Sequence, residues 1–198
     1  MMRYVFGLAF IVVCFVSCAP RISEITDPSQ RLNNVSGASV LPPQEPGWNI
    51  VGRMTQYQLT LAKRGQPDGE SYAAAVELSK SPNVDTEQEF LKWIVQRRAA
   101  APQTDRHRIV KDESNLVRGR EAVCVRTHEV SEDKAAHVGG MQIKEMVLEA
   151  ISYFCQHPKN KLLVVRIDYS HRHFAGNDDP AMATKANAFF DQVQFTDF

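Results

Sequence analysis

The chain has 198 residues, in which 23 Lys and Arg balance 23 Asp and Glu, so its formal net charge is zero. A neutral chain has no overall field that would attract nucleic acid, and we expect no nucleic-acid binding. The sequence also contains no P-loop and no dinucleotide fingerprint, and we expect no cofactor.

The first residues have the layout of a protein that is exported. A single basic residue, Arg3, precedes an apolar run from Tyr4 to Val16. That run is shorter than the roughly 20 residues that a membrane-spanning helix needs. We therefore interpret residues 1–17 as a signal peptide. A cleavage point among small residues explains Ser17, but it leaves Cys18 unexplained.

The stretch FVSC, residues 15–18, resembles the lipobox of bacterial lipoproteins, in which signal peptidase cuts before an acylated cysteine. The resemblance implies that Cys18 becomes a lipid-bearing N-terminus that holds the protein on a membrane. The next residue is Ala19 rather than Asp, which in that family is typical of proteins directed to the outer membrane. The alternative is a plain signal peptide with an incidental cysteine.

The residues that follow the cysteine have the composition of a linker. From Pro20 to Gly47 the chain is poor in large apolar residues and rich in Ser, Asn, Gln, Pro and Gly. Such a segment buries little surface, so we expect residues 18–47 to form a flexible tether. Residues 48–198 are about as long as one compact domain with a single core.

The domain is predicted to begin with a β-hairpin. Apolar and polar residues alternate in YQLTLAK, residues 57–63, and again in YAAAVELS, residues 72–79. This period of two is typical of half-buried strands. The turn-forming sequence GQPDG at 65–69 lies between them, and the three segments together predict two antiparallel strands joined by a turn.

The period then changes to that of a helix. Apolar residues recur at helical spacing in EFLKWIVQRR, residues 89–98, after Asp85 and Gln88, which form a capping pattern. A second helix is predicted to begin at Asp179 and Pro180. Between the two helices four segments are expected to be strands: 107–111, 121–130, 143–155 and 161–170.

The element order is therefore two strands, a helix, four strands and a helix. Runs of adjacent strands favour an α+β fold, in which helices pack on an antiparallel sheet of about six strands. Behind a lipobox and a tether, this order resembles the PsbP-like fold over residues 47–198. That family consists mostly of binding and assembly modules, so the resemblance implies a non-catalytic role. It rests on the arrangement of elements and implies no functional residue.

Two cysteines remain after the predicted processing, and an exported chain favours a disulfide between them. If their strands form a hairpin, the register that places Cys124 opposite Cys155 also places Gly139 opposite Gly140 in a turn. The alternative is a pair of buried free thiols. The same register predicts a shared core face for Val123, Val125, Met146, Leu148, Ala150 and Phe154.

Two histidines raise the question of a metal site. His171 and His173 are two residues apart, so their rings point the same way in an extended segment. The carboxylates of Asp168, Asp178 and Asp179 lie close in the sequence and could complete a site for a divalent ion. The alternative, which we favour, is a pair of histidines without a metal at the end of a strand.

One segment is locally basic. Eight basic residues stand against four acidic ones between residues 97 and 126, and most of the eight are arginines, which suit phosphate and carboxylate groups. We take four of them as a candidate recognition surface: Arg106, Arg108, Arg118 and Arg120. The alternative is an ordinary solvated helix end and loop.

The sequence thus predicts a lipid-anchored envelope protein that acts in the periplasm as a non-catalytic binding or assembly module. Its expected partners are the membrane, through the anchor, and a protein or an anionic envelope component. The alternative is an envelope hydrolase or a metal-dependent enzyme that uses the region of His171 and His173. In an enzyme, several titratable side chains should converge on a concave pocket. A binding module should instead present a broad basic or apolar patch on its surface.

Overall fold

The computed structural model describes residues 22–198 except 53–54, 66, 102–103, 119–120 and 139–141. The predicted signal peptide, Cys18, Arg120 and the turn at Gly139 and Gly140 lie outside the described residues. No helix in the described part of the chain is long and apolar enough to cross a membrane.

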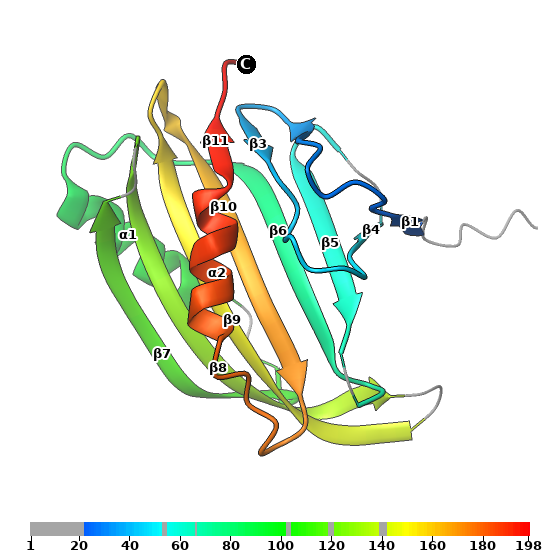
Figure 1. Ribbon diagram of the computed structural model, residues 1–198. Coiled ribbons are helices and arrows are strands. Elements are labelled where there is room, and N and C mark those ends of the chain that lie inside the picture. The colour runs from blue at the N-terminus through cyan, green and yellow to red at the C-terminus, as the bar shows by residue number, and fades with distance from the viewer. Residues whose placement is uncertain (1–21, 53–54, 66, 102–103, 119–120, 139–141) are drawn as a thin grey trace, which may run out of the picture.

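The body is built on one large antiparallel sheet, which is curved and twisted (Figure 1). Every neighbouring pair of its eight strands is antiparallel. In spatial order the strands are β1 (Ile22–Glu24), β4 (Asn49–Val51), β5 (Gln58–Arg64), β6 (Ser71–Lys80), β10 (Asn160–His173), β9 (Gln142–His157), β8 (Val123–Val138) and β7 (His107–Arg118).

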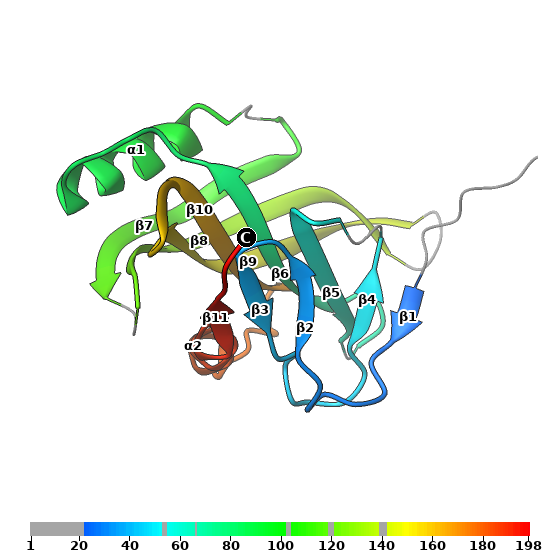
Figure 2. The ribbon, with the colours of Figure 1, turned by 90° about the horizontal axis from the view of Figure 1, so that it is seen from above.

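A small second sheet and two helices cover parts of the two faces. The second sheet has the order β11 (Val193–Phe195), β3 (Ala38–Val40) and β2 (Leu32–Val35). Together with α2 (Met182–Asp191) it packs on one face of the large sheet, whereas α1 (Glu87–Ala99) lies against the opposite face beside β7 and β8 (Figure 2). The predicted α+β class is therefore confirmed in outline.

Strand alternation decides which side chains reach each layer. On β10, Val165, Ile167 and Tyr169 are buried in the main core with Met182 and Phe189 of α2. The intervening side chains of the same strand lie on the face that α1 partly covers. Because successive side chains of a strand point to opposite faces, one strand serves two separate layers.

A capping box starts α1. The Thr86 hydroxyl accepts a hydrogen bond from the Glu89 backbone N–H, and the Glu89 carboxylate accepts one from the Thr86 backbone N–H. This cap is one residue later than the predicted pattern at Asp85 and Gln88. Phe90 and Ile94 are the buried residues of the helix, and they form a second, smaller core on the sheet.

The number of strands differs from the expected six. The short strands β1 to β4 and β11 were not predicted, because three or four residues carry too little periodicity to be recognised. The strand β7 was expected to end at residue 111 and instead continues to Arg118. The stretch 131–137, which has a polar sequence, belongs to β8.

The expectation of a flexible tether from 18 to 47 is corrected for its described part, residues 22–47. This segment supplies β1, β2 and β3, and Val35, Ala38 and Val40 are almost fully buried in the main core. The small second sheet closes that core because β3 pairs with both β2 and the C-terminal β11. The folded body therefore begins about 25 residues earlier than expected.

The predicted disulfide is present. Cys124 and Cys155 are bonded and face each other on β8 and β9 in the predicted register. That register continues as far as Asp133 opposite Met146, and an irregularity then shifts it by one residue.

The predicted core face of β8 and β9 is only partly buried. Val125 and Phe154 pack under α1, but Leu148 and Ala150 line an open hollow on the same face. The disulfide itself lies on the opposite face of the sheet, in the main core with Ile151.

Candidate functional site

Two rows of mostly small side chains cross the face of the sheet that carries α1. In one row Ala73 of β6, Ser170 of β10 and Ala150 of β9 are direct neighbours. In the next row the neighbours are Ala75, Asp168, Ser152 and Thr127. A solvated sheet face is usually covered by longer polar side chains. Small residues at matching positions on adjacent strands instead leave a depression.

This depression, which we call the hollow, has a volume of about 460 Å³. The C-terminal end of α1 borders it through Arg97 and Arg98, and Ala101 just after the helix also lines it. The helix lies over the third row of the sheet, where Val125 faces Phe154. The hollow is thus the part of this face that α1 leaves uncovered.

The edge of the hollow carries charges of both signs. The Arg98 guanidinium bonds to Asp112 at 2.5 Å and to Glu129 at 2.8 Å. Arg166 bonds to Asp168 at 2.9 Å.

Arg97 differs from these two arginines. It donates to the Ser79 hydroxyl at 3.3 Å and lies 5.4 Å from the centre of the Trp93 ring. Among the described residues it has no carboxylate partner, so its charge is available at the edge of the hollow.

Three of the four arginines singled out from the sequence are described, and they do not gather at the hollow. Arg106 forms two hydrogen bonds with Asp133, at 2.6 and 2.5 Å, and Arg108 forms two with Glu132, at 2.8 and 2.5 Å. Arg118 bonds to Glu87 at 3.3 Å. Arg120 lies outside the described residues.

These contacts pair the three arginines with acids of β8 or α1, so their charges are not free. The Arg106 guanidinium holds the pKa of Asp133 below its usual range, and Arg108 does the same for the pKa of Glu132. Arg108 and Glu132 are direct cross-strand neighbours on β7 and β8. Much of the local basic excess is therefore matched by acids of the adjacent strand.

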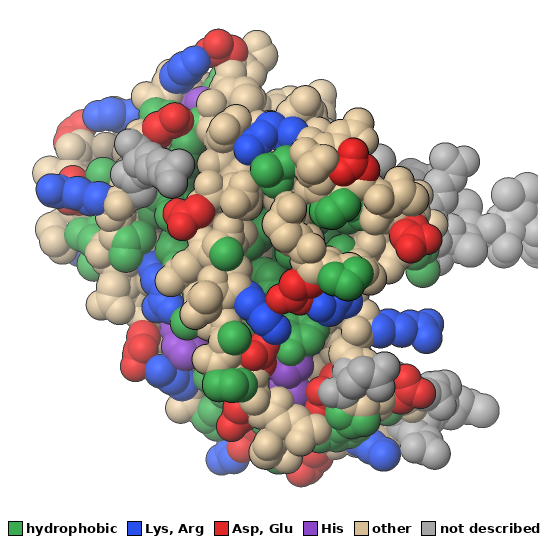
Figure 3. Space-filling view, in the orientation of Figure 1, with side chains coloured by type: hydrophobic (Ala, Val, Ile, Leu, Met, Phe, Trp, Pro, Cys, Tyr) green, Lys and Arg blue, Asp and Glu red, His purple; other side chains and the backbone are tan. Residues whose placement is uncertain are grey.

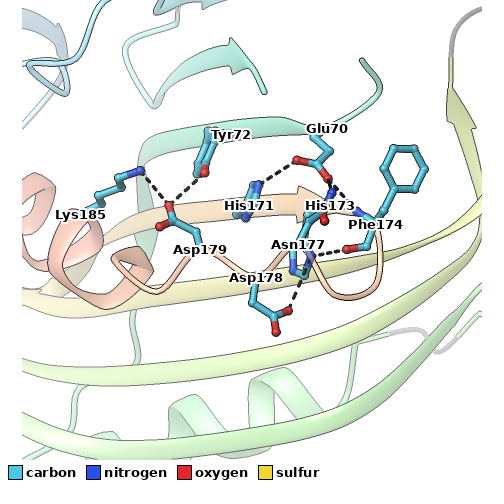
Figure 4. Close-up of polar contacts among 9 residues, drawn as sticks. All are labelled: Glu70, Tyr72, His171, His173, Phe174, Asn177, Asp178, Asp179 and Lys185. Carbon is cyan, nitrogen blue, oxygen red and sulfur yellow. Dashed lines mark hydrogen bonds and ion pairs between the residues drawn. The ribbon is translucent and has the colours of Figure 1, made fainter. Parts of the chain in front are cut away.

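The two histidines of the metal hypothesis lie on the other face of the sheet, in a buried polar cluster (Figure 4). The His171 ring stacks between Tyr72, with ring centres 4.1 Å apart, and His173, at 4.7 Å. Glu70 is 5% exposed, and its Oε2 lies 3.9 Å from His171 Nε2. The Glu70 carboxylate also accepts hydrogen bonds from the loop after β10, namely from Phe174 N at 3.1 Å and Asn177 Nδ2 at 2.8 Å.

The structure brings only some of the expected metal ligands together. His173 Nδ1 lies 3.8 Å from Asp178 Oδ1, but the Asp178 side chain is 80% exposed. Asp168 lines the hollow on the opposite face of the sheet. Asp179 instead accepts hydrogen bonds from Tyr72 and Lys185 (Figure 4). In the part of the chain that the structure describes, no group of three His, Cys, Asp or Glu side chains has the geometry to hold a metal ion.

The environment of His171 keeps its ring neutral. Burial lowers the pKa of His171, and the neighbouring His173 lowers it further. Neither ring nitrogen has a hydrogen-bond partner among the described residues. Since the ring is 2% exposed, it is poorly placed to exchange protons with a substrate.

Sequence reasoning missed the hollow and the buried Glu70. The three alanines at 73–75 fit a strand pattern, and that pattern alone does not indicate that two of them leave space on the open face. Glu70 lies beyond the expected strand, in the turn before β6. No pattern in the sequence marks it as buried.

Neither a family model nor a curated protein matches this sequence. Among solved structures, the chain is similar to the solution structure of cyanobacterial PsbP (CyanoP) from Synechocystis sp. PCC 6803. The similarity has a TM-score of 0.42 and 13% sequence identity, and it covers 96% of this chain and 98% of that one. The likeness is a distant one in fold, and it assigns no role to any residue.

Proposed function

We propose that this chain is a lipid-anchored envelope protein, held on the membrane through Cys18, that acts in the periplasm as a non-catalytic binding or assembly module. The observation that supports a binding role is the hollow, a concave and largely uncharged floor on the part of the sheet face that α1 leaves uncovered. A partner can approach the backbone of β6, β10 and β9 closely there, because the floor side chains are small.

The partner that best fits the hollow is a protein segment. An anionic polymer or headgroup would meet the carboxylates of Asp168, Glu129 and Asp112 beside the arginines. A protein segment can instead match both signs at the edge and place apolar side chains on the floor. The unmatched charge of Arg97 favours an acidic residue at the corresponding position of the partner.

The anchor proposed at Cys18 would hold the body close to the bilayer. Only residues 19–21 separate the cysteine from β1, which begins at Ile22. Four residue steps span at most about 14 Å even when the chain is fully extended. The edge of the sheet formed by β1 and β4 would therefore lie at the membrane surface.

The alternative function as a hydrolase or metal-dependent enzyme lacks a comparable observation. His171 and His173 are buried, and the residues that line the hollow include no histidine. The hollow is therefore the site on which the proposed function rests.

Photo-crosslinking in the native envelope tests the proposal. A benzophenone amino acid placed at Ala75, on the floor of the hollow, should crosslink to one or a few specific proteins. The same amino acid at Ala183, an exposed position of α2 on the other face, should not capture them. Equal capture from both positions, or none from Ala75, would contradict the proposal.

A second variant distinguishes the hollow from the arginine surface. Changing Arg106, Arg108, Arg118 and Arg120 to Gln removes the charges singled out in the sequence and leaves the hollow intact. If the partner binds in the hollow, crosslinking from Ala75 should persist in this variant at low and at high salt. A loss that is greatest at low salt would assign recognition to the arginines instead.

A further inference from the structure

The loop between β10 and α2, residues 174–178, is held to the body of the protein by a buried carboxylate (Figure 4). Glu70, in the turn before β6, accepts hydrogen bonds on one oxygen, Oε1, from Phe174 N at 3.1 Å and from Asn177 Nδ2 at 2.8 Å. Asn177 N also donates to the Phe174 carbonyl at 3.0 Å, which closes the loop on itself. The Phe174 ring packs against a small apolar cluster of β8 and β9, whereas residues 175–178 are exposed. The position of the loop thus depends largely on its contacts with Glu70.

His171 lies in the same cluster, but it makes no hydrogen bond to the described residues. Both of its ring nitrogens are buried without a partner there, and the ring is stacked between those of Tyr72 and His173. Oε2 of Glu70 lies 3.9 Å from His171 Nε2, which is beyond hydrogen-bonding distance. On this face of the molecule the histidines show only small areas between other side chains (Figure 3). A buried polar ring without a partner costs stability, which suggests a role other than stabilisation.

The groups around His171 are titratable, and the buried carboxylates among them already have partners. The groups that face the ring or its two stacked neighbours are Glu70, Tyr72, His173, Glu149 of β9, Asp178 and Asp179 before α2, Lys185 of α2, and the paired Glu45 of segment 42–45 and Lys63 of β5. Glu149 bonds to His128 of β8 at 2.7 Å, and Asp179 bonds to Lys185 at 2.8 Å. A proton on His171 would therefore add a positive charge to a cluster whose buried carboxylates are already bonded to other groups.

Such a proton is disfavoured as long as the cluster is closed. Burial lowers the pKa of His171, and His173 lowers it further, whereas Glu70, Asp179 and Glu149 oppose this shift without cancelling it. When the loop opens and water reaches the ring, the pKa of His171 returns toward its ordinary value of 6.5. Below pH 6.5 the open form therefore binds a proton that the closed form does not bind. The equilibrium between the two forms then shifts toward the open one.

Among the elements around His171, the loop is the one that opens most easily. Tyr72 and Glu149 belong to interior strands of the sheet and α2 packs in the main core, whereas most of the loop is exposed. We propose that residues 174–178 form an acid-released latch, which a proton on His171 frees from Glu70 so that the cluster opens to solvent. The latch requires neither the hollow nor the anchor, so it is independent of the proposed function.

Amide hydrogen exchange, measured by nuclear magnetic resonance, tests the latch. The reporters are the backbone N–H groups of Phe174 and Asn177, which are bonded only in the closed form. Their protection, which is the intrinsic exchange rate divided by the measured rate at the same pH, should fall between about pH 7.5 and pH 5.5. One group with an ordinary pKa of 6.5 in the open form changes the protection by at most about tenfold over this range.

A low concentration of urea separates local opening from global unfolding. Leu78 N, which donates to the Tyr57 carbonyl at 2.8 Å in the body of the sheet, reports global unfolding. Urea should accelerate the exchange of Leu78 and should barely affect the loop amides, because opening of the loop exposes little surface. If the loop amides are as sensitive to urea as Leu78, they exchange only when the whole protein unfolds, and the proposal is overturned.

A matched pair of histidine variants tests the role of His171. His171→Phe keeps a ring in the stack but cannot take up a proton, so the protection of the loop amides should no longer depend on pH in this range. His107→Phe removes a histidine of β7 that lies outside the cluster, and the fall in protection should persist. A fall that persists in His171→Phe, or its absence from the unmodified protein, would contradict the proposal.

A variant of the loop keeps the test decisive even if His171→Phe folds poorly. Asn177 is exposed, so Asn177→Ala leaves the core intact and removes one of the two hydrogen bonds from the loop to Glu70. Because that bond is made to a carboxylate, the protection of Phe174 N should fall by at least about tenfold at neutral pH. If it does not change, Glu70 does not hold the loop closed and there is no latch.

Discussion

Removal of the disulfide tests how the centre of the sheet is stabilised. Cys124 and Cys155 face each other on β8 and β9 and are completely buried. Their bond joins residues 31 apart in the sequence. For a loop of this length the chain-entropy relation gives a stabilisation of about 3.7 kcal/mol at 25 °C, because the cross-link restricts the unfolded chain.

We expect the double variant Cys124→Ala/Cys155→Ala to lose about that much free energy of unfolding, measured by urea denaturation. For a protein of this size the midpoint of thermal unfolding should fall by about 7 to 15 °C. The urea m-value should rise, since the unfolded chain without the cross-link is less compact.

Reductant provides the control for this measurement. It should lower the unfolding midpoint of the unmodified protein and leave that of the double variant unchanged. If the double variant keeps the original midpoint, and thiol labelling of the unreduced, unfolded protein finds both cysteines free, the disulfide does not form and the reasoning is refuted.

Three further predictions concern the anchor, the first helix and the buried histidine. Changing Cys18→Ala should move the protein from the membrane fraction to the soluble fraction, and an unmodified Cys18 in the intact mass of the unmodified protein would end the lipoprotein proposal. Thr86→Ala removes the cap of α1 and should lower the free energy of unfolding by about 1 kcal/mol, with faster amide exchange in the first turn; an unchanged stability would show that the cap contributes nothing. Because the pKa of His171 in the folded protein lies below 6.5, the unfolded chain binds more protons as the pH falls below 6.5, and stability decreases there. The slope contributed by this one group is at most about 1.4 kcal/mol per pH unit, and His171→Phe should remove it; an identical pH profile in urea denaturation of the variant would disprove the assignment.

The parts of the fold that the sequence predicted are those with a long, regular period. The pattern in residues 161–170 is sustained enough to identify β10. The register of β8 and β9 followed from one constraint, the pair of cysteines, and it holds until the irregularity after Asp133. An extra residue in one strand leaves no recognisable pattern, so its position could not be predicted.

The N-terminal segment illustrates a limit of composition as evidence. Residues 22–47 have few large apolar side chains, which is why a tether was expected. The few that are present, such as Val35 and Val40, are nevertheless buried, because β3 pairs with the distant strand β11. Pairing between residues about 155 positions apart is a property of the tertiary fold, and the local sequence carries no sign of it.

The hollow could not be predicted for a related reason. The hollow exists because small residues on four strands fall in the same rows, which depends on the register of every pair.

The position of the hollow in the sheet limits where a partner could be engaged. Strands in a sheet are about 4.8 Å apart, so β6 lies about 14 Å and β8 about 29 Å from the edge strand β1. If Cys18 is lipidated, β1 lies within about 14 Å of the anchor, and the whole hollow is then within about 45 Å of the bilayer. A long flexible tether would have allowed the domain to reach partners anywhere in the periplasmic space. With that anchor, the short connection would instead favour a partner that is itself embedded in the membrane or bound to it, because only such a protein would share this narrow zone at high local concentration.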